Sequence, residues 1–159
     1  MAAEDQLEAL LDAVSALSAA AIDDAVIGGI AVGLRSGVPR ATLDVDLAVP
    51  TTSATARVIE VLTAAGFEHR GSHRHSENFR HASGEPVQVA LDPMFDPMID
   101  RAEVVDVSGR SVKVVGTDDL VAMKERSAAS PERRKSKALR DLADVELLRG
   151  DVADDDEGW

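Results

Sequence analysis

The sequence predicts an α+β fold, in which helices pack on one small mixed β-sheet and the chain ends in two helices. Its 159 residues, 45% of them hydrophobic, suffice for one compact domain. Short β-branched segments alternate with segments of helical periodicity, without an internal repeat or a linker. We therefore expect one domain over residues 1–150, followed by an acidic, disordered tail over 151–159.

Helical periodicity and short apolar runs alternate in the first half of this domain. Gly28 and Gly29 end the first strand, and Thr51 and Thr52 are suitable caps for the helix after the second one. In order, the expected elements are a helix over 4–20, a strand over 25–27, a helix over 30–34, a strand over 43–49 and a helix up to 62.

The second half begins with strands and ends with helices. A polar connection rich in His and Arg separates the first strands, Thr117 is the expected cap of a helix, and Gly150 stops the last one. In order, the expected elements are strands within 67–92, a short helix between Pro93 and Pro97, a hairpin of 103–107 with 111–115, a helix from 117 and a helix over 134–148.

The charge and the composition exclude several classes of function. Seventeen basic against 29 acidic residues give a net charge of −12, which disfavours binding of duplex nucleic acid through many phosphates. The segment 124–140 is the basic exception. The absence of cysteine excludes disulfides and thiolate metal sites. Without an apolar run of about 20 residues or a signal-like start, the chain is expected to be soluble, cytoplasmic and independent of membranes.

Asp44 and Asp46 are the first candidate site residues. Side chains two apart on a strand share one face, so the two carboxylates converge. Like charges this close are unfavourable unless a cation lies between them, and hard oxygen ligands suit Mg²⁺. A solvated strand end explains an isolated acidic pair equally well, so the context decides.

That context is the glycine pair upstream. Gly28 and Gly29 follow a strand and open a short helix, where a backbone without side chains approaches a phosphate closely and helix N–H groups face it. A tight turn alone would also explain two glycines. The order of a glycine turn and then an acidic strand favours a site for a nucleoside triphosphate and its metal.

These segments resemble a known family. Val26-Ile27-Gly28-Gly29-Ile30-Ala31-Val32, followed by Gly37, Arg40, Thr42, Asp44 and Asp46, is similar to the first motif of the polymerase-β-like nucleotidyltransferases, and most closely to the AbiEii-type toxin branch. The segments 119–124 and 140–145 resemble the lysine helix and the aspartate motif of the same branch. The resemblance covers about residues 20–150 and implies a nucleotidyltransferase fold.

The resemblance also implies an activity. A nucleotide would pass from an NTP to a hydroxyl of an RNA end or a protein, and the chain would be the toxin of a pair with an antitoxin protein. The implied nucleotide-binding residues are Gly28, Gly29, Arg40, Thr42 and Lys124. The implied metal ligands are Asp44, Asp46 and Asp92, and the implied catalytic residues are these three with Lys124 and Asp141.

One position departs from the family pattern. A third carboxylate is expected on a later strand, but the matching segment is Val87-Gln88-Val89-Ala90-Leu91-Asp92, with Ala90 in place of the acid. Asp92 lies on the same face about 7 Å further along a strand. Either Asp92 acts from this shifted position or the site has lost its third ligand.

Structural roles are the alternatives for several of these residues. Lys124 is solvated or paired with an acid, Asp141 and Asp144 pair with Lys137 and Arg140 one turn away, and Arg40 anchors its loop. His69, His73, His75 and His81 are expected in a polar hairpin rather than a zinc site, because three arginines lie among them. The alternative functions are a silent nucleotide- or protein-binding module and a small-molecule, antibiotic-modifying nucleotidyltransferase. The sequence does not indicate an oligomeric state.

Overall fold

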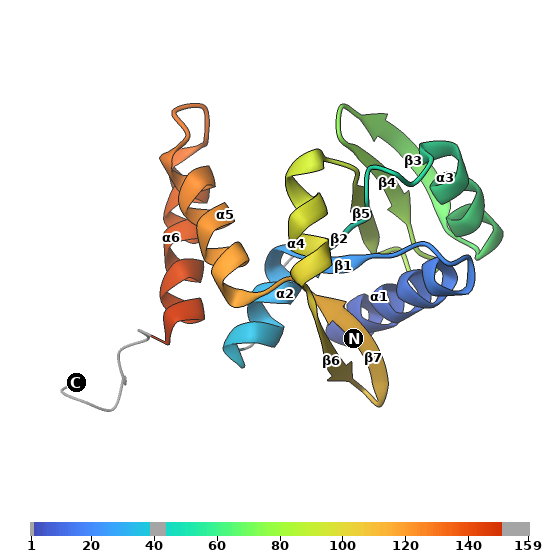
Figure 1. The fold of residues 1–159 in the computed structure, drawn as a ribbon, viewed down its shortest axis with the longest axis horizontal. Helices are drawn as coiled ribbons and strands as arrows, with labels where there is room; N and C mark the ends of the chain where they lie inside the picture. Colours follow the sequence, from blue (N-terminus) through green and yellow to red (C-terminus); the bar gives the residue numbers. More distant parts are fainter. Residues whose placement is uncertain (1, 39–43, 151–159) are drawn as a thin grey trace.

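Seven strands form one mixed sheet in the computed structural model, which describes residues 2–38 and 44–150 (Figure 1). The strands are β1 (Ala25–Ile27), β2 (Val45–Ala48), β3 (Glu68–His73), β4 (Ser76–Arg80), β5 (Pro86–Ala90), β6 (Glu103–Val107) and β7 (Arg110–Val114). The helices are α1 (Ala2–Ala19), α2 (Gly28–Ser36), α3 (Thr55–Ala64), the 3₁₀ turn η1 (Pro93–Phe95), α4 (Asp96–Arg101), α5 (Thr117–Ala129) and α6 (Lys135–Arg149). The α+β fold with a mixed sheet and two final helices is confirmed.

The order of the strands across the sheet is β3-β4-β5-β2-β1-β7-β6. The two central strands, β1 and β2, are antiparallel to each other. Outside them, β1 pairs with β7 and β2 pairs with β5, both in parallel. The strand that carries Asp46 therefore lies between β1, which leads into the glycine pair, and β5, which carries Gln88.

The two faces of the sheet differ in polarity because strand side chains alternate. Val45 and Leu47 of β2 are fully buried in the core, whereas Asp46 between them is only half-buried. In the same way, Val87 and Val89 of β5 are buried on either side of Gln88. The apolar face packs against α1 and α3, and the polar face carries the candidate site.

Helices α5 and α6 form an antiparallel hairpin that packs on α2, at the left of Figure 1. The sheet with α1 and α3 lies to the right, and α2 lies between the two parts. The start of β2 therefore lies next to α2. None of the helices in the described ranges has both the length and the apolar character that a membrane span requires.

Three element boundaries differ from the sequence predictions. Helix α2 includes both glycines instead of starting at Ile30, because Gly28 takes a φ of +72° that makes the turn inside one residue. Thr51 does not cap α3, whose N-cap is Ala54; its hydroxyl and N–H donate to the Asp96 carboxylate instead. Thr117 is the first residue of α5 rather than its cap, which is Gly116.

Candidate active site

Gly28 and Asp46 are in close contact across the two central strands. Asp46 pairs with Ile27 in the register of β1 and β2, which brings its side chain next to the first residue of α2. A Cβ atom at position 28 would lie 2.3 Å from Oδ2 of Asp46. The positive φ and this clash both require glycine at position 28. The sequence predicts the glycine turn, and the structure shows that the turn lies against the carboxylate of Asp46.

The start of α2 offers backbone donors beside that carboxylate. The helix has nine residues, and Ile27, its N-cap, makes no side-chain capping hydrogen bond within the described part of the chain. The first N–H groups of a helix lack intrahelical partners, and the helix dipole favours an anion there. Gly28 and Gly29 therefore present donors suited to phosphate oxygens.

Asp44 and Asp46 lie at the start of β2, close enough for their charges to interact. Burial raises the pKa of Asp46 to about 6, the neighbouring Asp44 contributes to this rise, and Lys124 opposes both effects. Asp44 itself is exposed. The folded protein thus holds a carboxylate that is costly to ionise, and a hard divalent cation bound by both side chains would remove that cost. The donor set fits Mg²⁺.

The position beside Asp46 on the neighbouring strand is occupied by Gln88. The parallel register of β2 and β5 pairs Asp46 with Gln88 and Ala48 with Ala90. The amide of Gln88 donates to the Ser76 hydroxyl at 3.1 Å. The neighbour of the aspartate pair on β5 is therefore a neutral amide, two residues before Ala90, where the family pattern predicts the acid.

Asp92 lies just after β5, where it caps η1. Its Oδ1 atom accepts the N–H of Met94 at 3.0 Å. Asp92, Gln88 and Asp46 line one groove of about 380 Å³ together with Gly28. The structure thus brings the predicted third carboxylate into the groove of Asp46 and also gives it a local structural role.

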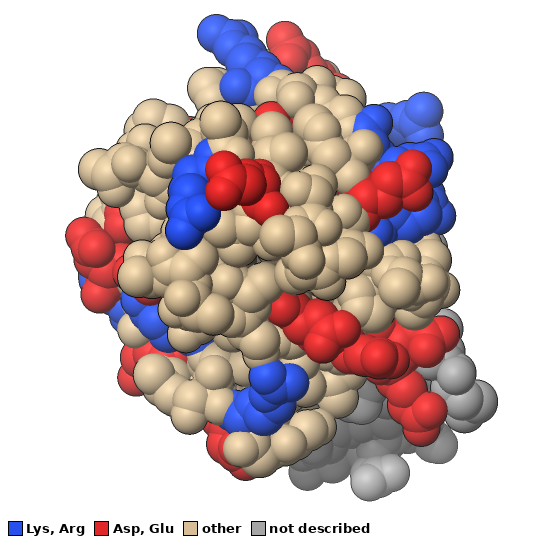
Figure 2. Space-filling view, turned by 90° about the vertical axis from the view of Figure 1, so that its right-hand side faces the viewer, with Lys and Arg blue, Asp and Glu red and all other residues tan. Residues whose placement is uncertain are grey.

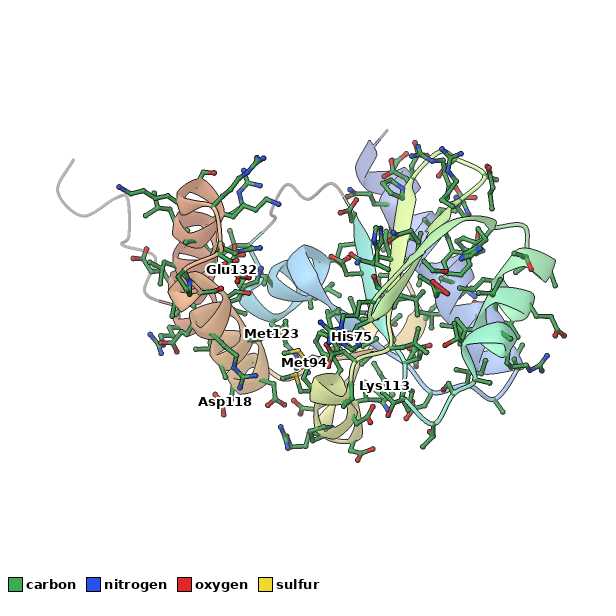
Figure 3. All side chains as sticks on the ribbon, turned by 90° about the horizontal axis from the view of Figure 1, so that it is seen from above. His75, Met94, Lys113, Asp118, Met123 and Glu132 are labelled. Atoms are coloured by element: carbon green, nitrogen blue, oxygen red, sulfur yellow. The ribbon has the colours of Figure 1, made fainter. Side chains whose placement is uncertain are left out.

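The other wall of this groove is apolar. Met94 of η1 and Met123 of α5 lie toward each other between the sheet and the helical hairpin, with His75 of the β3–β4 turn nearby (Figure 3). Phe95 and Ala90 complete this wall. A planar, partly apolar group such as a nucleobase is suited to such a surface, because thioether and aromatic side chains pack well against rings.

Lys124 lies in a buried charge network rather than in solvent. Its Nζ atom is 3.1 Å from Oδ2 of Asp144 and 3.5 Å from Oδ1 of Asp141, and both carboxylates are buried. Arg133 makes a two-pronged contact with Asp141, at 2.8 and 3.0 Å. Among the described residues, Asp141 therefore pairs with Arg133 and Lys124 instead of with Lys137, and the carboxylates of Asp141 and Asp144 both face α5.

The network directs a positive charge toward the aspartate pair. Lys124 lowers the pKa of Asp46, so its charge lies within electrostatic reach of the groove. Arg40 and Thr42, the remaining predicted nucleotide-binding residues, lie outside the described residues. Of the predicted residues that are described, Gly28, Asp46 and Asp92 line the groove. Asp44 lines a neighbouring pocket instead, and Gly29 is buried in the first turn of α2. Lys124 acts on Asp46 from α5, and Asp141 pairs with Lys124 from α6.

The histidines do not gather at this site. His75 lines the groove, whereas His81 is buried next to α1, where its Nε2 atom lies 2.7 Å from Asp12 and its Nδ1 atom 2.8 Å from the Ser83 hydroxyl. Glu8, Asp12 and His81 could together reach one cation, but none of them lines the groove of Asp46. This group is not predictable from the sequence, because Asp12 and His81 meet only through the packing of α1.

Comparison with known proteins agrees with this geometry. The family model described as "Nucleotidyl transferase AbiEii toxin, Type IV TA system" matches residues 9–157. The chain belongs to the AbiEii family. The resemblance predicted from the glycine and aspartate motifs is thereby confirmed, and the chain is a nucleotidyltransferase of this family. No curated protein sequence matches it.

Solved structures share the fold. The antibiotic-resistance factor ANT(2'')-Ia superposes with a TM-score of 0.63 at 16% identity, over 93% of this chain and 91% of that one. The lincosamide antibiotic adenylyltransferase LnuA gives 0.61 at 12% identity, over 86% and 91%. An antigenic nucleotidyltransferase-like protein from Paracoccidioides brasiliensis gives 0.60 at 24% identity, over 91% and 75%. At these identities the AbiEii chain shares their architecture.

Proposed function

We propose that this AbiEii protein transfers a nucleotide from an NTP to a hydroxyl group of an RNA end, with Mg²⁺ as the cofactor. The observation that carries the proposal is the contact between Gly28 and Asp46, since it joins a phosphate-binding helix start to a metal-binding carboxylate. The two binding functions must be adjacent in nucleotidyl transfer, because the metal and the helix start would both bind oxygens of the same triphosphate.

Each residue has a separate role in binding the nucleotide. The N–H groups at the start of α2 hold the β- and γ-phosphates, and Lys124 neutralises part of their charge. Asp44 and Asp46 hold Mg²⁺, which when bound supplies Lewis-acid and template chemistry. The wall of Met94 and Met123 packs against the base.

The reaction forms one bond and breaks one. The acceptor oxygen attacks the α-phosphorus, the bond between the α-phosphorus and the bridging oxygen breaks, and pyrophosphate leaves. Gln88 cannot take the hydroxyl proton, because an amide is not a base. We assign that role to Asp92, whose second oxygen is not used in capping Met94 and which lines the same groove.

The family description supports a biological role as well. The matching family model names a toxin of a type IV toxin–antitoxin system. We propose that this chain is such a toxin and that a separately encoded antitoxin protein is its partner. A neighbouring gene for a small helix-turn-helix protein would support this role, and unaffected growth after expression of the active enzyme alone would contradict it.

A labelling experiment tests the activity. The purified protein is incubated with each α-labelled NTP, Mg²⁺ and total RNA, and the label is followed to RNA, to protein or to a small molecule such as an aminoglycoside. We expect label on RNA, with none in Asp44→Ala. Label on the small molecule would favour an antibiotic-modifying enzyme, and tight NTP binding without any transfer would favour a silent binding module.

Asp92 is tested by a substitution that keeps the cap. Asparagine caps helices about as well as aspartate, so Asp92→Asn preserves the hydrogen bond to Met94 and removes only the base. We expect a roughly 10²-fold or larger decrease in turnover, of the order that general base catalysis contributes. Gln88→Ala is the matched control. Equal, small effects of the two substitutions would exclude Asp92 from the reaction.

A further inference from the structure

A second pocket, of about 210 Å³, adjoins the groove on the polar face of the sheet. Its polar lining comes from Asp44, Arg70, Asn78, Arg80 and Gln88. We call it the arginine pocket. None of its residues except Asp44 has a role in holding the nucleotide.

The register of the sheet makes the arginine pocket continuous with the groove. Asp46 pairs with Gln88 between β2 and β5, and Gln88 pairs with Asn78 between β5 and β4. These three side chains form one row across the polar face, and Gln88 borders both cavities. Asp46 lies in the groove and Asp44 in the arginine pocket, so the aspartate pair spans the boundary between the two.

The two arginines retain donors for a ligand. Arg70 pairs with Glu68 at 3.1 Å, but both side chains are about half exposed or more, so the pair contributes little and is readily exchanged. Arg80 donates one N–H to the carbonyl oxygen of Gly84 at 3.0 Å, which holds its guanidinium at the pocket. A guanidinium carries five N–H donors in a plane, an arrangement that matches phosphate oxygens.

Positive charge gathers in the arginine pocket although the chain as a whole is acidic. The net charge is −12, yet two guanidinium groups lie beside an exposed carboxylate of the site. On the face of the described structure shown in Figure 2, Lys and Arg occur in small separate groups rather than as one continuous surface. The arginine pocket is therefore suited to contact one or two phosphates at a defined place.

We infer that the arginine pocket binds the phosphate beside the acceptor hydroxyl, so that Arg70 and Arg80 position the acceptor RNA strand at its free 3′ hydroxyl. In such a strand the terminal sugar carries both the hydroxyl and a phosphate. A hydroxyl at the aspartate pair places that phosphate near Asp44, on the side away from α2. A Ser, Thr or Tyr hydroxyl brings no phosphate, so a protein acceptor leaves both arginines without a ligand. The inference rests on the proposed function.

The double substitution Arg70→Gln and Arg80→Gln tests the inference. The matched control is Arg57→Gln on α3, because Arg57 is also about half exposed and pairs with a glutamate, Glu60, at 3.2 Å, but lines neither cavity. Binding of a short single-stranded RNA with a free 3′ hydroxyl is followed by fluorescence anisotropy at several salt concentrations, and NTP binding is measured separately.

We expect the double variant to bind the RNA at least tenfold more weakly, with NTP affinity unchanged. The slope of log K against log salt should become shallower by about 0.7 for each phosphate that the variant no longer neutralises. A parallel decrease in affinity for DNA of the same sequence also supports the pocket, since the phosphate is common to both. In transfer assays, KM for the RNA should rise while kcat at saturating RNA stays close to that of the wild type.

Three results would overturn the inference. The first is that the double variant binds the RNA as tightly as the wild type does. The second is that the double variant transfers the nucleotide to protein hydroxyls as fast as the wild type does. The third is that NTP affinity decreases as much as RNA affinity, which would place the triphosphate in the pocket. Failure of the proposed function gives a different result from failure of this inference. A wild-type protein that neither binds nor transfers nucleotide contradicts the proposed function, whereas the RNA-binding comparison still decides the role of the arginines.

Discussion

Asp46→Asn should make the metal-free protein more stable and inactive at the same time. The pKa of Asp46 is raised from 3.8 to about 6, mainly by burial and then by Asp44. The folded state therefore binds this proton more tightly than the unfolded state does. The corresponding stabilisation is complete below about pH 3.8, decreases as the pH rises, and is absent above about pH 6. The asparagine side chain is neutral at every pH, so the variant does not lose this stabilisation as the pH rises.

The size of the effect follows from the same values. Relative to the wild type, the variant should gain about 1 kcal/mol at about pH 4.5 and about 3 kcal/mol at about pH 7.5. Urea denaturation of both proteins in EDTA at these two pH values measures the difference. Saturating Mg²⁺ should stabilise only the wild type and narrow the gap at about pH 7.5. A gap that is independent of pH, or a variant less stable than the wild type at the higher pH, would refute the reasoning.

Asp24 provides a matched control away from the groove. It is buried, and burial and Asp23 raise its pKa to about 7 against the opposing charge of Lys113. Asp24→Asn should therefore also stabilise the protein at high pH, over a range that extends about one pH unit further than for Asp46. Because Asp24 lines neither the groove nor the arginine pocket, activity should remain. An inactive Asp24→Asn variant would show that stability and the site are coupled.

Three further predictions concern the groove and its supports. Gly28→Ala should abolish activity and destabilise the fold, because its Cβ would clash with Asp46. Gly33→Ala in the same helix should be neutral or stabilise by up to about 1 kcal/mol, because its Cβ would meet only the backbone oxygen of Val38, at 3.7 Å. Thermal melting and transfer assays compare the two variants. Lys124→Met should destabilise by about 3 kcal/mol, because it removes a cation that faces the buried carboxylates of Asp141 and Asp144, and transfer activity should decrease as well; urea denaturation and transfer assays measure the two effects. Gln88→Glu should add a carboxylate beside the metal site and tighten Mg²⁺ binding several-fold by calorimetry; unchanged affinity would show that position 88 does not face the ion.

The sequence contained much of the fold and the centre of the site. Period and composition are local properties, so the strand of Asp44 and Asp46, the glycine pair and the two final helices were all predictable from neighbouring residues. The aspartate pair needed only the alternation of a strand, and the glycine turn needed only the absence of side chains. The errors at Ile30, Thr51 and Thr117 are also local, because a residue suited to a boundary does not by itself determine where the hydrogen bonds begin.

Contacts between distant segments were decided only by the tertiary structure. The neighbour of Asp46 on β5 depends on strand register, which selects Gln88 rather than Ala90. The partners of Lys124 depend on how α6 is rotated against α5, and the pairing of His81 with Asp12 depends on the packing of α1. Sequence alone determined which chemical groups the AbiEii chain possesses and which lie on one face of an element. Which of them meet is a property of packing, since one residue of register or a fraction of a helical turn exchanges one neighbour for another.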